Sequence, residues 1–230
     1  MTFLFTPHST SAIPLQGSDH VFPVHRIYCV GQNYSDHVKE MGGDPRENPP
    51  VFFSKPSDAV VIDNKPVTYP PATSNLHYEV ELVVALASGG SNISVGNALA
   101  HVLGYAVGID FTRRDLQAEA KKQGRPWDAA KGFDQSAPTS AIRRVNGGNH
   151  PLEGRISLSV NGETRQDAKL SDMIWSVPEI ISELSLYFEL KAGDLIFTGT
   201  PAGVSAVVAG DQISAEIDGV GEISFELVSN

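Results

Sequence analysis

The sequence predicts a β-rich α+β fold in one domain, and three observations lead to that prediction. Short stretches rich in β-branched residues, bounded by Gly, Pro, Asn or Asp, outnumber helical segments, at about nine or ten strands to three or four helices. The 230 residues, of which 41% are hydrophobic, are the length of one domain with a sizeable core. No internal repeat or linker divides the chain.

The N-terminal half begins with an expected arm. Residues 1–24 are rich in Pro, Ser and Thr, so we expect them to drape over a single domain that spans residues 25–230. Residues 42–50 (GGDPRENPP) have no periodicity and strong turn chemistry, which predicts a loop. In this half, strands are predicted at residues 27–30, 51–54, 59–62, 79–87 and 103–109, and helices at residues 35–41, 95–101 and 112–123.

The C-terminal half contains a hairpin signal and one long helix. Asn161 and Gly162 separate the stretches 156–160 and 163–166, as in a two-residue β-hairpin. The helix predicted at residues 173–190 has Pro178 in its first turn, where a backbone N–H has no helical partner to lose. Further strands are predicted at residues 194–198, 212–217 and 220–228.

Charge and cysteine content narrow the function classes. Seventeen basic residues against 27 acidic ones give a net charge of −10, which argues against nucleic acid or an anionic membrane as main partner. The single cysteine, Cys29, cannot form an intramolecular disulfide, and no stretch has the character of a membrane span or signal peptide. We therefore expect a cytoplasmic protein, and a small anionic ligand would need local positive charge.

Three acidic residues form the first candidate site. Glu79 and Glu81 lie two residues apart on a predicted strand, which places both carboxylates on one face, and Asp110 follows the end of another strand. Carboxylate oxygens are the ligands of a hard divalent cation. The same pattern also fits a solvated sheet face with an N-capping Asp, so the spacing alone leaves both interpretations open.

A histidine and a glutamate form the second candidate site. His37 and Glu40 are spaced i, i+3 on a short predicted helix, where the carboxylate can orient the imidazole as a general base for water. An exposed His–Glu contact has the same spacing and remains an alternative. The loop 42–50, directly after this helix, is a candidate lid.

A cluster of basic residues supplies local positive charge. Such residues can hold a carboxylate ligand or stabilise an oxyanion, although Lys and Arg on helices are often only solvated, and Arg114 and Lys131 are the stronger candidates. The turn 198–203 (TGTPAG) is either an anion-binding nest or an ordinary tight turn, and His77 is a supporting or a structural residue. The cluster consists of Arg113, Arg114, Lys121, Lys122, Arg125 and Lys131.

Taken together, these segments resemble the fumarylacetoacetate hydrolase family, and most of all its bacterial fumarylpyruvate hydrolases. The resemblance covers about residues 25–228, nearly the whole chain. The motifs that carry it, in the order in which the family shows them, are CVGQNYSDHVKEMG (29–42), VFFSKPSDAV (51–60), HYEVELVVAL (77–86), GYAVGIDFTRRDLQ (104–117), GRPWDAAKGFD (124–134) and DLIFTGTPAGV (194–204).

The resemblance implies the family's β-roll fold with short helices, a homodimer, and a bound Mg²⁺ or Mn²⁺, with Ca²⁺ a possible occupant in crystals. It also implies roles for ten side chains. These are Glu79, Glu81 and Asp110 for the metal, His37, Glu40 and Lys131 for catalysis, and Arg114, Gln117, Thr200 and Lys55 around the substrate.

The activity implied is hydrolysis of a C–C bond in a 2,4-dioxo acid (an acylpyruvate), foremost fumarylpyruvate to fumarate and pyruvate in gentisate-type aromatic catabolism. The 1-carboxylate and 2-oxo group would chelate the cation, and His37 would deprotonate a water that attacks C4. The cation and Lys131 would then stabilise the pyruvate enolate. Arg113, Arg125 and Arg46 are the candidates for holding the distal carboxylate.

Two other functions remain open on the sequence. Oxaloacetate decarboxylation or tautomerisation of a small oxo acid would use the same metal–enolate chemistry without water attack. A metal-dependent protein that only binds small acids would need no general base, so the His37–Glu40 pair argues against it.

Overall fold

The computed structural model describes residues 3–34, 49–146 and 148–230. Its largest sheet has six strands, in the order β12-β9-β8-β15-β3-β4. Their bounds are β3 (Ile27–Gly31), β4 (Val51–Lys55), β8 (Val80–Leu86), β9 (Val102–Ile109), β12 (Arg143–Arg144) and β15 (Leu195–Phe197).

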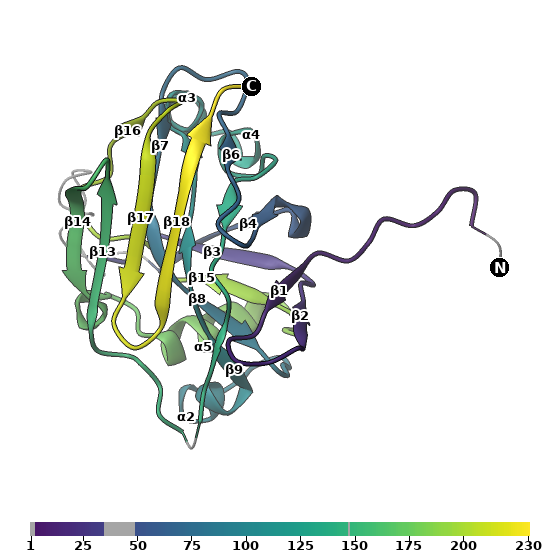
Figure 1. Ribbon diagram of the computed structural model, residues 1–230. Helices are drawn as coiled ribbons and strands as arrows, with labels where there is room; N and C mark the ends of the chain where they lie inside the picture. Colours follow the sequence, from purple (N-terminus) through teal and green to yellow (C-terminus); the bar gives the residue numbers. More distant parts are fainter. Residues whose placement is uncertain (1–2, 35–48, 147) are drawn as a thin grey trace.

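A second sheet has five strands, in the order β14-β13-β17-β18-β6, and lies in front of the first in Figure 1. Its strands are β6 (Val67–Thr68), β13 (Arg155–Val160), β14 (Glu163–Lys169), β17 (Gln212–Ile217) and β18 (Gly221–Val228). Three small sheets, β1-β2, β10-β7-β16 and β11-β5, complete the strands described. Their bounds are β1 (Ala12–Pro14), β2 (Val21–Pro23), β5 (Val60–Val61), β7 (Leu76–His77), β10 (Thr112–Arg113), β11 (Ala137–Pro138) and β16 (Ala206–Val207).

Helices are short and few in the described part of the chain, so the predicted β-rich α+β fold is confirmed. None of them is long and apolar enough to cross a membrane. The α-helices are α2 (Val95–Ala98), α3 (Arg114–Gln123), α4 (Asp128–Lys131) and α5 (Val177–Tyr187), and the 3₁₀-helices are η1 (Ser57–Ala59), η2 (Leu99–His101) and η3 (Leu170–Asp172).

Two predicted helices begin later than their sequence pattern indicates. The helix predicted at residues 112–123 begins at Arg114, because β10 pairs with β7 immediately before it. The helix predicted at residues 173–190 begins at Val177, because Ser176 and Glu179 form a capping box there. It ends at Tyr187, since Phe188 is extended. The helix predicted at residues 35–41 lies outside the described residues.

The predicted hairpin at Asn161 and Gly162 is confirmed. Both residues have positive φ, 53° and 79°, as the two central positions of a type I′ turn require. They join β13 to β14, which pair antiparallel.

The two faces of β8 serve two different apolar cores. Leu82 and Val84 pack into the larger core, to which the five-stranded sheet also contributes, whereas Val83 and Ala85 pack into a smaller core on the other face. Because side chains alternate along a strand, Glu81 lies on the face of Val83. The smaller core therefore continues into the carboxylate cluster.

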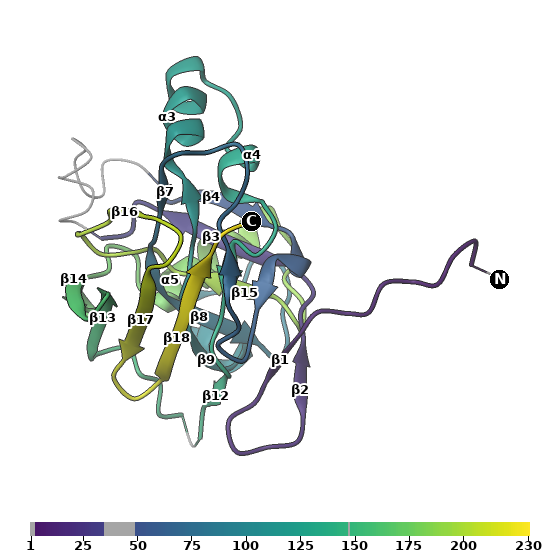
Figure 2. The same ribbon diagram turned by 45° about the horizontal axis from the view of Figure 1, so that its top comes forward.

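The N-terminal segment contributes to that smaller core. Strands β1 and β2 form an antiparallel pair, and Ile13 and Phe22 are buried in the core beneath them. Residues 3–10 are exposed, and Figures 1 and 2 both show this stretch running away from the body of the protein.

Candidate active site

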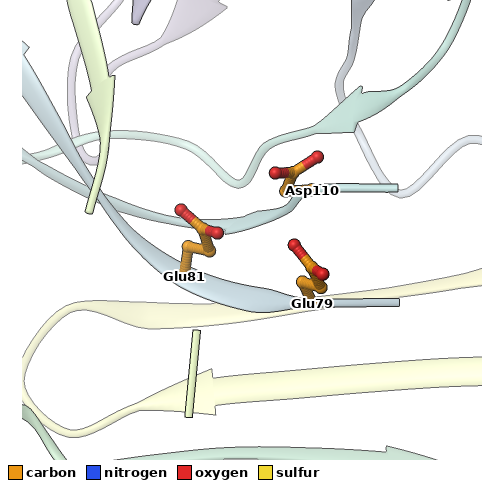
Figure 3. Close-up of side chains that lie close together, drawn as sticks. All are labelled: Glu79, Glu81 and Asp110. Atoms are coloured by element: carbon orange, nitrogen blue, oxygen red, sulfur yellow. The ribbon is translucent and has the colours of Figure 1, made fainter. Parts of the chain in front are cut away.

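The register between β8 and β9 brings three carboxylates together. Val80 pairs with Ile109, and Asp110 N–H donates to the Glu79 carbonyl at 2.8 Å, so the residues that flank the two strands lie opposite each other. One carboxylate oxygen from each of Glu79, Glu81 and Asp110 lies within 4.8 Å of the others. Figure 3 shows the three side chains on the same side of the two strands. All three are buried.

Two buried lysines balance part of this negative charge. Lys131, at the end of α4, places its Nζ 2.7 Å from Glu79 Oε2 and 2.6 Å from Asp110 Oδ2. Lys55, at the end of β4, places its Nζ 2.8 Å from Asp110 Oδ1. Burial lowers the pKa of Lys131, but the negative charges of Asp110 and Glu79 outweigh it and leave the pKa raised. Lys131 is therefore an ammonium ion.

Arg114, the first residue of α3, adds a third cation. Its Nη2 is paired with Glu79 Oε1, and its Nη1 donates to Gln117 Oε1 at 2.6 Å. Its Nε donates to His77 Nδ1 at 3.3 Å, which leaves Nε2 of His77 to donate to Asn75 Oδ1 at 2.9 Å. Burial, followed by the nearby Arg114 charge, lowers the pKa of His77 to about 4. His77 is thus a neutral acceptor that orients the guanidinium.

The turn at residues 198–203 contacts the cluster through its backbone. Gly199 N–H donates to Glu81 Oε2 at 2.8 Å. The hydroxyl of Thr200 accepts a hydrogen bond from Gln166 Nε2 at 2.8 Å, and Gln166 Oε1 accepts from Val80 N–H at 3.0 Å. Because the Thr200 oxygen accepts from Gln166, the hydroxyl can donate its own proton to a ligand.

The carboxylate cluster fits a divalent cation in two respects. Burial, and then the charges of Asp110 and Glu79, raise the pKa of Glu81 well above its ordinary value, so additional positive charge would favour the ionised form. Asp110 Oδ1 is buried, and within residues 3–34, 49–146 and 148–230 its one polar contact is with Lys55 Nζ. Three hard oxygen donors are a suitable set for Mg²⁺ or Mn²⁺.

The carboxylate cluster faces a pocket that is partly open to solvent. All three carboxylates line this pocket, as do Arg114, Gln117, Lys131 and Thr200 of the predicted substrate or catalytic residues. The sequence did not single out Gln32, Phe53 or Trp127, which also line it, and it placed Lys121 only within the basic cluster. Lys55 lies behind Asp110 and is not one of the lining residues.

The remaining residues that the sequence predicted for the site either lie outside the described residues or line other pockets. His37, Glu40, Arg46 and most of the loop 42–50 lie outside the described residues. Arg113 lines a separate pocket, with its guanidinium 4.4 Å from the centre of the Phe133 ring. Arg125 lines an open groove along β4, beside Pro126 and Phe52.

The fold is that of one enzyme family. The fumarylacetoacetate (FAA) hydrolase C-terminal domain matches residues 26–228, and the chain belongs to that family. A mitochondrial oxaloacetate tautomerase from Rattus norvegicus is 47% identical over 201 residues, which are 87% of this chain and 90% of that protein. A fumarylpyruvate hydrolase from a Ralstonia species is 46% identical over 174 residues, 76% of this chain and 90% of that one.

A solved structure is similar over its full length. The fumarylpyruvate hydrolase from Pseudomonas aeruginosa, crystallised with Mn²⁺ and pyruvate, is 48% identical and superposes with a TM-score of 0.97, covering 100% of both chains. The resemblance inferred from the sequence motifs is therefore confirmed at the level of the family.

Proposed function

We propose that the protein is a metal-dependent hydrolase that cleaves a C–C bond in an acylpyruvate, foremost fumarylpyruvate, to give fumarate and pyruvate. The observation that carries the proposal is the buried cluster of Glu79, Glu81 and Asp110 facing a pocket with a cationic wall. The similarity to fumarylpyruvate hydrolases supports the choice of substrate.

The three carboxylates would hold Mg²⁺ or Mn²⁺. When bound, the cation would supply a Lewis acid for the 1-carboxylate and 2-oxo oxygens of the substrate. Arg114, held by His77 and Gln117, would orient the substrate carboxylate, and the Thr200 hydroxyl would donate to a substrate oxygen.

The protein's own groups would perform the proton transfers and balance the charge. His37, oriented by Glu40, would take a proton from water as the water oxygen adds to C4. The C3–C4 bond then breaks, its electron pair passes to C3, and the acyl group leaves with the water oxygen as a carboxylic acid. The Lys131 ammonium would lie close to the enolate of pyruvate before C3 is protonated.

The experiment that tests this proposal measures pyruvate release from fumarylpyruvate in the presence of Mn²⁺ or Mg²⁺. We expect turnover that is lost on chelation and restored by the metal, and His37→Ala is expected to lose at least about 100-fold in kcat. Absence of pyruvate release from fumarylpyruvate and from acetylpyruvate would overturn the proposal.

A second candidate activity is tautomerisation of oxaloacetate, because tautomerases of that substrate are as similar to this chain as the hydrolases are. This reaction moves a proton at C3 and needs no attacking water. Rapid enol–keto conversion of oxaloacetate by a preparation that releases no pyruvate from acylpyruvates would favour it.

We also propose that residues 25–230 form the catalytic domain with residues 1–24 as an arm, that two copies form a homodimer, and that the enzyme acts in gentisate-type aromatic catabolism. Size-exclusion chromatography with light scattering tests the dimer. Growth on gentisate after deletion of the encoding gene tests the catabolic role.

A further inference from the structure

Helix α3 presents a row of polar side chains to the pocket. Arg114, Gln117 and Lys121 are spaced i, i+3 and i+7, so they share one face of the helix, and all three line the pocket. Figure 2 shows α3 rising beside α4 at one end of the molecule. Arg114 lies at the carboxylate cluster, and Lys121 lies two turns farther along.

Among the residues that the structure describes, Lys121 differs from the other cations of the pocket in having no anionic partner. Lys131 and Arg114 are paired with carboxylates of the cluster, but Lys121 makes no ion pair within the described part of the chain. Its Nζ lies 5.0 Å from the centre of the Trp127 ring instead. Partial burial of the ammonium, followed by the charges of Arg114 and Lys131, lowers the pKa of Lys121, although the residue as a whole is exposed. An anion bound beside it would relieve that repulsion.

The pocket wall between the two ends of this row is aromatic. The rings of Phe53 and Trp127 are 5.9 Å apart, and both line the pocket. A flat, unsaturated carbon chain packs well against aromatic rings of this kind. The pocket thus has a charged end at the carboxylate cluster, an aromatic middle and a second cation at Lys121.

The spacing along α3 fits a diacid of seven carbons. Seven residues of helix advance about 10 Å along the axis. The two carboxyl carbons of an extended seven-carbon chain are roughly 7–8 Å apart, and a hydrogen bond at one end adds about 3 Å. A diacid with its first carboxylate near Arg114 therefore brings its second one within reach of Lys121.

We infer that Lys121 binds the distal carboxylate of the substrate and so selects acylpyruvates that end in a carboxylate. This inference rests on the proposed hydrolase activity and names the part of the pocket that distinguishes fumarylpyruvate from acetylpyruvate, which has no second carboxylate. Of the arginines considered from the sequence, Arg113 lines a separate pocket and Arg46 lies outside the described residues. Arg125 lines the adjoining groove, which shares Phe53, Trp127 and Lys131 with this pocket, whereas Lys121 lines the pocket itself.

The test compares two substrates in three variants. Lys121→Met removes the charge, Lys121→Arg keeps it, and Lys122→Met removes the neighbouring charge, which is exposed like Lys121 but does not line the pocket. The measured quantity is the ratio of kcat/KM for fumarylpyruvate to kcat/KM for acetylpyruvate. We expect Lys121→Met to lower this ratio about 10- to 100-fold, mainly through KM for fumarylpyruvate, as loss of a charged hydrogen bond does. Lys121→Arg should restore most of it, and Lys122→Met should leave it unchanged.

Other outcomes separate the inference from the function on which it rests. An unchanged ratio in Lys121→Met, or equal losses for both substrates, overturns the role of Lys121 while the hydrolase activity stands. A wild-type enzyme that cleaves neither substrate overturns the proposed function itself. Melting temperatures and Mn²⁺ stoichiometry of the three variants show whether a loss comes from misfolding.

Discussion

At the scale of single residues, the carboxylate cluster combines two opposing requirements. A divalent cation needs ionised oxygens, whereas burial favours the neutral acid. Lys55 and Lys131 offset part of the cost of burying the charged carboxylates, since each forms an ion pair with Asp110 in the protein interior. Counting the contacts of described residues, Glu81 is the least compensated of the three carboxylates, with Gly199 N–H as its hydrogen-bond donor and a raised pKa.

Glu81→Gln is therefore expected to weaken metal binding without lowering the stability of the metal-free protein. The amide keeps an oxygen for the Gly199 N–H but removes a buried charge, so the melting temperature of the metal-free protein should stay equal or rise. Mn²⁺ affinity should fall by more than about 100-fold, because the cation loses a charged ligand. Calorimetric titration measures the affinity, and the exposed Glu222→Gln is the control. Mn²⁺ binding as tight as that of the wild type would contradict the assignment.

Gly199 is constrained by both its backbone and its neighbours. Its φ is +96°, and a Cβ there would lie 2.6 Å from the Cβ of Asn33. Gly199→Ala should lower stability by about 1–3 kcal/mol and weaken Mn²⁺ binding, because the displaced turn no longer holds Glu81. Gly210→Ala is a matched control, with φ +97° and no atom within 4 Å of the added Cβ. If both variants bind Mn²⁺ equally well, the turn does not position Glu81.

At the scale of elements, the sequence predicted the site best where its side chains lie on or beside a strand. The period of two in β8 predicted that Glu79 and Glu81 share a face, and β-branched content predicted the strands on which they and Asp110 depend. The register of β8 and β9, which sets Asp110 opposite Glu79, is not contained in either strand's own pattern. The pattern therefore grouped the three residues only as an open candidate, and the family resemblance assigned them to one metal site.

The sequence was least informative where the site depends on contacts between distant elements. Lys55 reaches Asp110 from the edge strand β4, and Lys121 faces the pocket only because α3 packs beside α4 with Trp127 between them. A lysine on a helix of an acidic protein is usually solvated, and nothing in the local sequence distinguishes Lys121 from Lys122. The difference lies in the helix face that tertiary packing turns toward the pocket.

The start of α3 makes a pH-dependent contribution to stability through Asp115. Its carboxylate accepts hydrogen bonds from Thr73 Oγ1 at 2.7 Å, Ser74 N–H at 3.2 Å and Leu116 N–H at 2.9 Å. Burial raises the pKa of Asp115, but these hydrogen bonds outweigh it, and the pKa is lowered from 3.8. A lowered folded-state pKa means that the contribution is present above about pH 4 and is lost as the pH falls through the folded value.

Asp115→Asn should therefore lower the free energy of unfolding by about 1 kcal/mol at pH 7, and the difference from the wild type should shrink below pH 4. Urea unfolding at a series of pH values measures it. Glu119→Gln, an exposed charge on the same helix, is the control. A difference that stays constant from pH 7 to pH 3 would show that the ionised carboxylate is not the stabilising form.

At the scale of the whole molecule, the net charge of −10 describes the surface better than the site. Three carboxylates are matched by Lys55, Arg114 and Lys131 within the cluster, and Lys121 adds a further positive charge to the pocket. With a bound divalent cation the pocket would become clearly positive, as a dianionic substrate requires. An acidic protein can thus hold a small anion because the positive charge is local.

Metal binding should also stabilise the molecule as a whole, because the unfolded chain does not bring Glu79, Glu81 and Asp110 together. At a free Mn²⁺ concentration of 100 times Kd, linkage predicts a gain of about 2.7 kcal/mol, or roughly 5–10 °C in melting temperature for a chain of this length. Differential scanning calorimetry with increasing Mn²⁺, and then with excess chelator, measures the shift. Glu81→Gln in the same titration should show little or no shift. A wild-type melting temperature that does not respond to Mn²⁺ or to chelator would mean that the cluster does not hold a cation in the folded protein.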